Sequence, residues 1–171
     1  MKNRIELARY FNELGLRVGA EIGVSQGINA ANFCREIPGL KLYCVDPWEG
    51  RRKEVWLKNA KERLAEYDTV FIRKNSLDAL HDFPEASLDF VFIDANHSFD
   101  FVMQDIIEWS RKVRMGGIVA GHDYYHSRSG TMGVVEAVDA YVLAHNIKLN
   151  LTSKDPDSDD DKEPSFWWVK S

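Results

Sequence analysis

Cysteine is scarce in this chain, whose 171 residues include only Cys34 and Cys44. Two cysteines are too few for the disulfide framework of a small secreted domain, so we expect both to be reduced thiols. Long apolar runs are also missing, since none approaches the roughly 20 residues that a membrane helix needs. The first six residues lack the apolar stretch of a signal peptide. These absences predict a cytoplasmic protein without a membrane partner.

The sequence also lacks an excess of positive charge. Its formal net charge is −5, and most of this comes from segment 154–163, where six acidic residues face only Lys154 and Lys162. The remainder is close to neutral, which argues against a broad nucleic-acid footprint. We therefore expect no nucleic-acid partner. The acidic run lies in a loop expected over 152–165, and we interpret it as a solvated loop.

Nothing in the chain marks a linker or an internal repeat. Hydrophobic residues make up 44% of the sequence and charged residues 29%, as in an ordinary globular protein. A chain of this length can bury one sizeable core. We predict a single domain over 1–171, with an N-terminal helix within 1–15.

Apolar strand patterns alternate with helical patterns along the chain. Helices are expected over 2–14, 30–37, 51–67, 99–113 and 132–145. Strands are expected over 18–22, 42–45, 70–72, 88–93, 118–121, 149–151 and 166–169. Continuously apolar strands alternating with helices are typical of a parallel sheet covered on both faces. The predicted fold is α/β: a Rossmann-like, doubly wound, seven-stranded, mostly parallel sheet with an antiparallel C-terminal strand and helices on both faces.

The most informative motif follows the first expected strand. There Glu21 is followed by a glycine turn with the spacing Glu-x-Gly-x-x-x-Gly, which places glycines at Gly23 and Gly27. Glycine serves where the backbone needs a positive φ or must approach a ligand closely, and the next helix presents free N–H groups at its start. The spacing differs from the dinucleotide fingerprint Gly-x-Gly-x-x-Gly. It therefore points to a nucleoside ligand without a pyrophosphate.

Four expected strands end in an acidic residue: Glu21, Asp46, Asp94 and Asp123. In open parallel sheets ligands bind at the carboxyl ends of the strands. One such acid is often only a helix cap or turn former, but four beside a glycine turn indicate a site. Asp46 lies 19 residues after Gly27, close to the offset at which an acid accepts hydrogen bonds from a ribose diol.

The order of these motifs resembles the class I S-adenosylmethionine-dependent methyltransferases, and within them the small-molecule O-methyltransferases related to catechol and macrocin O-methyltransferases. The resemblance spans about residues 17–145. It is carried by four stretches: EIGVSQG (21–27), VDPWEG (45–50), FIDANHSF (92–99) and GGIVAGHDY (116–124).

The resemblance implies S-adenosylmethionine as the cofactor, together with a set of residues that bind it. By position these are Glu21, Gly23, Ser25 and Gly27 for the methionine part, Asp46 with Trp48 nearby for the ribose, Asn75, Ser76 and Leu77 for the adenine, and Asp94 for the methyl end. The pattern departs from the superfamily in one respect, since Ser25 stands where a glycine is frequent. A serine narrows the backbone options but can still hydrogen-bond the ligand.

The resemblance also raises the question of a divalent metal. In the metal-dependent members, an acid after the fourth strand and an acid-containing pair after the fifth bind the cation. Here those positions hold Asp94 and the pair His122 and Asp123. Magnesium prefers oxygen ligands, whereas histidine favours transition metals, so either kind of ion is considered. The alternative is that Asp94 faces cofactor and substrate and that His122 or Asp123 acts without a metal.

A hydroxyl acceptor must lose its proton during methyl transfer. His97 and His122 are the candidate general bases, because histidine titrates near neutral pH, and Asp94 completes the catalytic set. For His97 a place at the helix start or against the cofactor is an equally good interpretation.

The function expected is O-methylation of a small molecule or a sugar by S-adenosylmethionine. One rival is an NAD-dependent oxidoreductase on a related fold, which the missing fingerprint disfavours. The other is a methyltransferase-like domain that binds a nucleoside without catalysis, which the acids and histidines disfavour. Little sequence lies outside the expected core. The acceptor is therefore either small or bound partly by a second subunit, which leaves a homodimer open.

Overall fold

The computed structural model describes residues 1–50, 53–127, 130, 132–154 and 162–171. Most of the acidic run at 154–163, namely 155–161, thus lies outside the described residues, as do 51 and 52 at the start of the helix expected over 51–67. Among the described helices, none is both long enough and apolar enough to cross a membrane.

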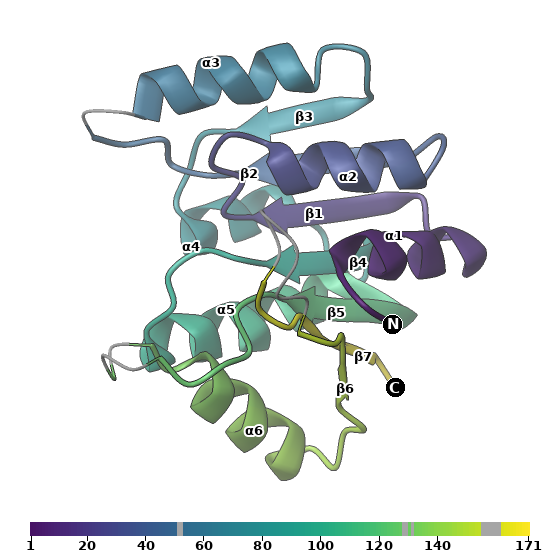
Figure 1. Cartoon of the computed structure of the whole chain (residues 1–171), viewed down its shortest axis with the longest axis vertical. Coiled ribbons are helices and arrows are strands. Elements are labelled where there is room, and N and C mark those ends of the chain that lie inside the picture. Colours follow the sequence, from purple (N-terminus) through teal and green to yellow (C-terminus); the bar gives the residue numbers. More distant parts are fainter. Residues whose placement is uncertain (51–52, 128–129, 131, 155–161) are drawn as a thin grey trace.

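One seven-stranded sheet forms the centre of the molecule (Figure 1). Its strands are β1 (Val18–Ile22), β2 (Lys41–Val45), β3 (Thr69–Ile72), β4 (Leu88–Ile93), β5 (Val113–Gly121), β6 (Asn150–Leu151) and β7 (Phe166–Val169). Their order across the sheet is β3-β2-β1-β4-β5-β7-β6. Strands β1 to β5 pair in parallel, whereas β7 runs antiparallel to both β5 and β6. The predicted mostly parallel sheet with an antiparallel C-terminal strand is confirmed.

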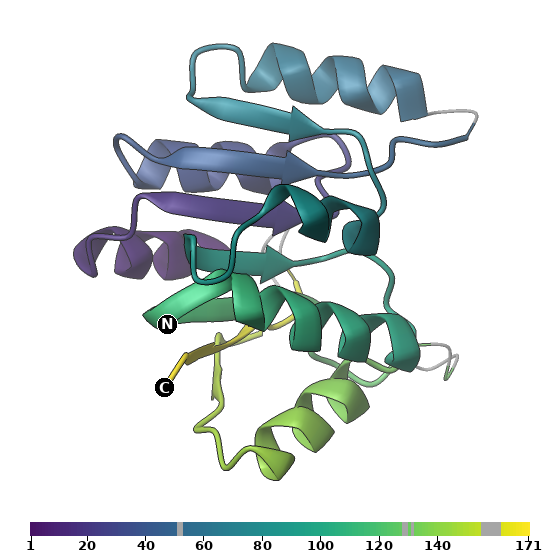
Figure 2. The ribbon, with the colours of Figure 1, turned by 180° about the vertical axis from the view of Figure 1, so that it is seen from behind.

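Helices cover both faces of this sheet, as predicted. They are α1 (Arg4–Glu13), α2 (Ile28–Glu36), α3 (Lys53–Arg63), α4 (Ser76–Ala79), α5 (Phe99–Lys112) and α6 (Val134–Ala144), with a short 3₁₀ turn, η1, over Leu80–Asp82. Helices α1, α2 and α3 lie on one face (Figure 1) and α4, α5 and α6 on the other (Figure 2).

Each face has its own apolar core. On the first face the rings of Phe11, Phe33 and Phe90 lie 4.9–5.8 Å apart between their centroids. On the second, Trp109 of α5 is fully buried and packs edge-on against Phe83. Burying one such side chain stabilises the fold by about 1.5–3 kcal/mol. The two cores together hold the sheet between two packed layers of helices.

Two local features differ from the prediction. Helix α4 and the turn η1 were not expected, because four residues are too few to show a helical period. Strand β5 begins at Val113 rather than at residue 118, so that Gly116 and Gly117 lie within the strand, at a bulge opposite β4. A Cβ on Gly117 would lie 2.4 Å from the Asp89 carbonyl oxygen. Gly117 thus permits the close approach of β4 at this point of the strand.

The chain changes direction across the sheet between β1 and β4. After β1 it proceeds outward to β2 and β3, and it then returns to form β4 on the other side of β1. Helix α2 leaves β1 toward one face and α5 leaves β4 toward the other (Figures 1 and 2). Such a switch point opens a crevice at the carboxyl ends of the strands, where ligands bind in this architecture.

Candidate functional site

A pocket of about 750 Å³ opens at these carboxyl ends. Most of the residues predicted to bind the cofactor line it: Gly23, Ser25, Asp46, Asn75, Ser76, Leu77 and Asp94. They come from the segments that follow β1, β2, β3 and β4, and Ser76 and Leu77 belong to α4. The structure therefore brings residues spread over 72 positions of sequence to one pocket, and their roles in binding stay predictions.

Backbone hydrogen bonds tie the strand ends together below this pocket. At each of four neighbouring strand pairs, the residue that follows one strand donates its N–H to the last carbonyl of the next strand. The bonds are Asp46 to Ile72 (3.2 Å), Gly23 to Val45 (2.8 Å), Asp94 to Ile22 (2.8 Å) and His122 to Ile93 (3.0 Å). We call these four bonds the strand-end ladder. It fixes the backbone of Asp46, Asp94 and His122 at the edge of the sheet, where the loops after their strands begin.

Gly23 has no room for a side chain. Its φ is +93°, and a Cβ there would lie 2.0 Å from the carbonyl oxygen of Asp94. Glycine is the residue that tolerates both the positive φ and the close approach. It thereby lets the loops after β1 and β4 meet at the floor of the pocket.

Asp46 fixes the loop after β1. Its carboxylate accepts hydrogen bonds from the backbone N–H groups of Ser25 (2.9 Å) and Trp48 (2.7 Å). Both donors have positive φ values, +52° and +42°, which cost energy outside glycine. Each carboxylate oxygen has a second lone pair, so Asp46 can still accept bonds from ribose hydroxyls while it stabilises these turns.

Trp48 lies behind the pocket rather than in its lining. Its ring is fully buried, and its Nε1 donates a 2.8 Å hydrogen bond to the carbonyl of Ser25. The residue predicted to lie near the ribose therefore supports the loop that carries Ser25. Its bulk and its N–H group both serve this purpose.

Gly27 also stands outside the lining. It is the N-cap of α2 with a φ of +75°, and a Cβ there would lie 3.2 Å from the backbone and side chain of Ala60 in α3. The second glycine of the motif thus serves the turn into α2 and its close packing on α3. Its predicted contact with the methionine part has no counterpart in the lining of the pocket.

Glu21 is buried beneath the pocket, with 1% of its surface exposed. Its Oε1 accepts a 2.9 Å hydrogen bond from Asn29, and its Oε2 has no hydrogen-bond partner among the described residues. Burial raises the pKa of Glu21 to about 8, although the bond from Asn29 opposes the shift. Burying an acid with one oxygen unpaired costs free energy. Glu21 was predicted to contact the methionine part of the cofactor, but it lies beneath the residues that line the pocket.

The raised pKa predicts how stability changes with pH. The folded-state pKa of Glu21, about 8, exceeds its unfolded value of about 4.3. Its contribution to the free energy of unfolding is therefore fully present below pH ~4.3 and is lost as the pH rises through 8. Glu21→Gln should remove this dependence. Between pH 5 and 9 the variant should gain on the order of 4 kcal/mol over the parent in denaturant unfolding. The exposed Glu13→Gln is the matched control. Stability differences that stay constant with pH would contradict the prediction.

A second set of titratable groups gathers beside the pocket, after β4 and β5. The Nε2 of His97 lies 3.3 Å from a carboxylate oxygen of Asp94 and 3.1 Å from one of Asp123. The hydrogen bonds to Asp123 and Asp94 raise the pKa of His97 to about 10. Burial alone would raise the pKa of Asp123, but the bonds from His122 and His97 lower it below its ordinary value. The two carboxylates thus hold an imidazolium between them.

The structure gathers a different histidine than the metal prediction named. Within the described part of the chain, ligand atoms of Asp94, His97 and Asp123 lie within 4.8 Å of one another. His122 instead places its Nδ1 3.0 Å from the other oxygen of Asp123. Two carboxylate oxygens and one imidazole nitrogen fit a divalent cation, with the nitrogen favouring a transition metal. The expected pair of His122 and Asp123 is thus replaced in this grouping by His97 and Asp123.

Arg4 was not predicted to take part in the site. It reaches from the first turn of α1 to Asp94, with 3.8 Å between the guanidinium and the carboxylate, and 9% of its surface is exposed. This nearly buried cation pairs with the carboxylate of Asp94, and its charge opposes the rise in the pKa of Glu21. A sequence signal existed, since Arg4 lies among the apolar positions of an amphipathic helix.

Asp105 was missed as well, although it lines the pocket. It lies on α5 with 4% of its surface exposed, between the buried side chains of Val102, Ile106 and Trp109. These four positions form one face of the helix. An acid in the middle of an apolar face was the signal that could have found it.

The topology and the acids at the strand ends define a protein of the class I S-adenosylmethionine-dependent methyltransferase type. A family model for the methyltransferase domain matches residues 20–124. The match covers more than half of the chain, so the protein belongs to the methyltransferase domain family, and the resemblance to S-adenosylmethionine-dependent methyltransferases is confirmed.

Solved structures share this fold at low identity. One is an O-methyltransferase of tomaymycin synthesis from Streptomyces achromogenes, in complex with S-adenosylmethionine, with a TM-score of 0.71, 21% identity, and coverage of 98% of this chain and 78% of that one. An O-methyltransferase from Bacillus cereus in complex with S-adenosylhomocysteine has a TM-score of 0.70 and 18% identity, and the match covers 98% of this chain and 80% of that one. A putative rRNA methylase from Clostridium thermocellum has a TM-score of 0.71 and 10% identity, and the match covers 100% of this chain and 99% of that one. No curated protein matches the sequence.

Proposed function

We propose that this protein transfers a methyl group from S-adenosylmethionine to a hydroxyl group of a small molecule or a sugar. The observation that carries the proposal is the position of His97 between Asp94 and Asp123, where Asp94 also lines the large pocket. A base candidate thus lies beside the predicted methyl end of the cofactor site. The O-methyltransferase names of two structural neighbours support the choice of oxygen as the acceptor.

The cofactor supplies a methyl group already activated on a sulfonium sulfur. The acceptor oxygen attacks the methyl carbon, the carbon–sulfur bond breaks, and its electron pair stays on sulfur. The protein holds the reactants in line, and the acceptor hydroxyl gives its proton to a base. We assign Asp46 to the ribose, and we assign the loop from Gly23 to Ser25, which also lines the pocket, to the remaining cofactor.

His97 carries a proton at neutral pH in the ligand-free protein, because its pKa is raised to about 10. His97 can accept a proton from the acceptor hydroxyl only after it has lost the proton that its own ring carries. A divalent cation held by Asp94, His97 and Asp123 would take the place of the proton on His97, so that His97 would then act as a ligand and not as the base, while the positive charge would favour an ionised acceptor oxygen. The donor set fits such an ion, so we include a cation in the proposal.

Calorimetry with S-adenosylmethionine, S-adenosylhomocysteine and NAD tests the cofactor half of the proposal. We expect binding of the first two and none of NAD. Transfer of an isotope-labelled methyl group to a panel of catechols, phenols and sugars then tests the acceptor half. Labelling of amines alone, with no hydroxyl compound labelled, would refute O-methylation.

Removal of divalent metal should lower methyl transfer by at least tenfold, because the acceptor oxygen loses its nearby positive charge. The measurement is turnover after dialysis against EDTA, followed by addition of Mg²⁺, Mn²⁺, Co²⁺ or Zn²⁺ one at a time. Binding of S-adenosylhomocysteine to the dialysed protein serves as the control and should change little. Full turnover in the presence of EDTA would show that the histidine and the two carboxylates act without a metal.

A further inference from the structure

Asp105 has no part in the mechanism above, yet it lines the cofactor pocket. Its side chain is nearly buried, and it accepts a hydrogen bond from the hydroxyl of Ser76. Among the residues that the structure describes, no ion pair neutralises its charge. A buried carboxylate without a cation is retained at a cost, which a ligand bearing a hydrogen-bond donor would offset.

The hydrogen bonds around Ser76 have a fixed direction. The indole N–H of Trp109 can only donate, and it donates to the Ser76 hydroxyl oxygen over 2.7 Å. The hydroxyl proton is therefore free to point to Asp105, which it does. Burial raises the pKa of Asp105 to about 6, so the group is an ionised acceptor at neutral pH. It has capacity for a further donor from the pocket.

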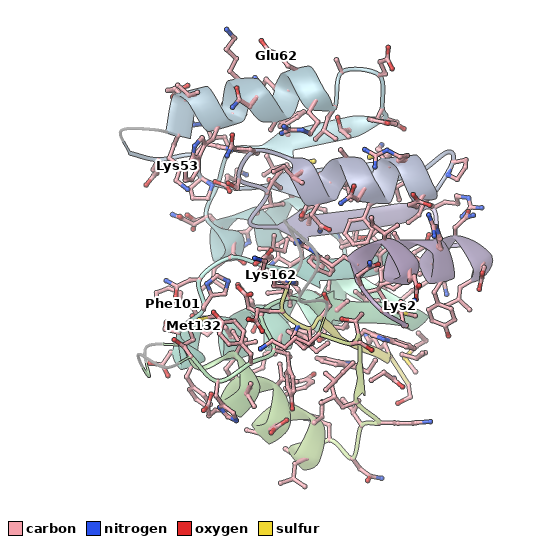
Figure 3. The ribbon with its side chains drawn as sticks, in the orientation of Figure 1. Lys2, Lys53, Glu62, Phe101, Met132 and Lys162 are labelled. Carbon is pink, nitrogen blue, oxygen red and sulfur yellow. The ribbon has the colours of Figure 1, made fainter. Side chains whose placement is uncertain are left out.

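Apolar side chains accompany this acceptor on the pocket wall. Phe101 lies one helical turn before Asp105 on α5, and Leu77 follows Ser76 on α4. Both line the pocket although 52% and 38% of their surfaces are exposed. In Figure 3, Phe101 lies at the same left-hand edge of the molecule as Lys53 of α3, which also lines the pocket. Exposed apolar side chains beside a buried acceptor suit a flat heteroaromatic ring that carries an amine.

We propose that Asp105 reads the base of the cofactor by accepting a hydrogen bond from the exocyclic amine of adenine, with Phe101 and Leu77 against the ring. This inference rests on the proposed function, because it takes the nucleoside to be that of S-adenosylmethionine. It makes Asp105 a specificity-determining residue. A base with a carbonyl in place of the amine would present an acceptor to an acceptor and leave the buried acid unpaired.

The wild-type protein provides the first test without any substitution. Its affinities for S-adenosylhomocysteine and S-inosylhomocysteine, which differ in that amine, are compared by calorimetry at pH 7.5. A hydrogen bond to a buried charged group predicts a preference for the adenine compound of roughly 10- to 100-fold. Equal affinities for the two compounds would overturn the inference.

Asp105→Asn provides the second test. The new amide can donate to the inosine carbonyl, while its oxygen still accepts the bond from Ser76. We expect the adenine-to-inosine ratio of affinities to fall by at least tenfold. Asp100→Asn is the matched control, because Asp100 lies on the same helix but is exposed and outside the lining of the pocket, and its ratio should equal that of the wild type. Thermal unfolding of both variants monitors the fold.

A structural role for Asp105 gives a different result from base recognition. If Asp105→Asn lowers both affinities by the same factor, the ratio stays constant and the inference is wrong. If the wild type binds S-adenosylhomocysteine and S-inosylhomocysteine equally well, the inference fails while the proposed function stands. If it binds neither S-adenosylmethionine nor S-adenosylhomocysteine, the proposed function itself fails.

Discussion

Replacing His97 with glutamine should lower the rate of methyl transfer by roughly 10²- to 10⁴-fold, the usual contribution of a general base. Its ring lies between Asp94 and Asp123 at 3.3 and 3.1 Å. Glutamine can keep a hydrogen bond to one carboxylate, but it can neither take up a proton nor supply the imidazole ligand of the proposed cation. His97 does not line the large pocket, so S-adenosylhomocysteine should bind with nearly unchanged affinity. Turnover and calorimetry on the same preparation measure the two effects.

His122→Gln is the comparison that decides between the two candidate bases. The His122 ring lies 3.0 Å from the second oxygen of Asp123, whereas it is His97 that groups with both Asp94 and Asp123. We therefore expect the loss of His122 to lower turnover by less than tenfold. His81→Gln, at an exposed turn away from the pocket, controls for the substitution itself. A large loss for His122→Gln together with an active His97→Gln would assign the base to His122 instead.

Gly23→Ala should destabilise the fold by about 3 kcal/mol or more and abolish cofactor binding. The added Cβ would fall 2.0 Å from the Asp94 carbonyl oxygen, so the loops after β1 and β4 must separate. Asp94 would move with its loop, away from His97 and from the lining of the pocket. Urea unfolding measures the loss of stability, and calorimetry with S-adenosylhomocysteine measures the loss of binding.

Gly39→Ala separates the effect of the clash from that of backbone strain. Gly39 has a φ of +76°, similar to that of Gly23, but nothing lies within 4 Å of the position of its Cβ. It should therefore cost only about 1–2 kcal/mol, the penalty of a left-handed residue, and leave binding intact. Equal effects of the two substitutions would mean that strain alone, and not the approach to Asp94, explains the requirement for glycine at position 23.

The fold was predictable because its signals are local. Apolar strands such as Leu88–Ile93 end in an acid and are followed by an amphipathic helix, and this repeats along the chain. What escaped prediction depends on contacts between distant residues. The glycines at 116 and 117 look like a turn in isolation, and the approach of Asp89 from β4 turns them into a bulge.

The site was predictable to a similar depth. Parallel strands align their carboxyl ends, so acids that follow them must share one edge of the sheet, and Asp46 and Asp94 line one pocket as this rule requires. The sequence could not say which histidine approaches Asp94. That choice depends on the loop after β5, where Asp123 has a φ of +59° and its carboxylate contacts both His97 and His122. No spacing rule encodes such a backbone turn.

The strand-end ladder has a consequence for how this enzyme could be redesigned or could diverge. Its four bonds use only main-chain atoms of residues at the ends of β1 to β5, so the cofactor half of the site is built independently of side-chain identity in later segments. The segment between β5 and α6 attaches beyond the last bond, at His122. We therefore expect that changes in this segment beyond Asp123 leave the ladder and the cofactor pocket in place, so that the acceptor side can vary separately.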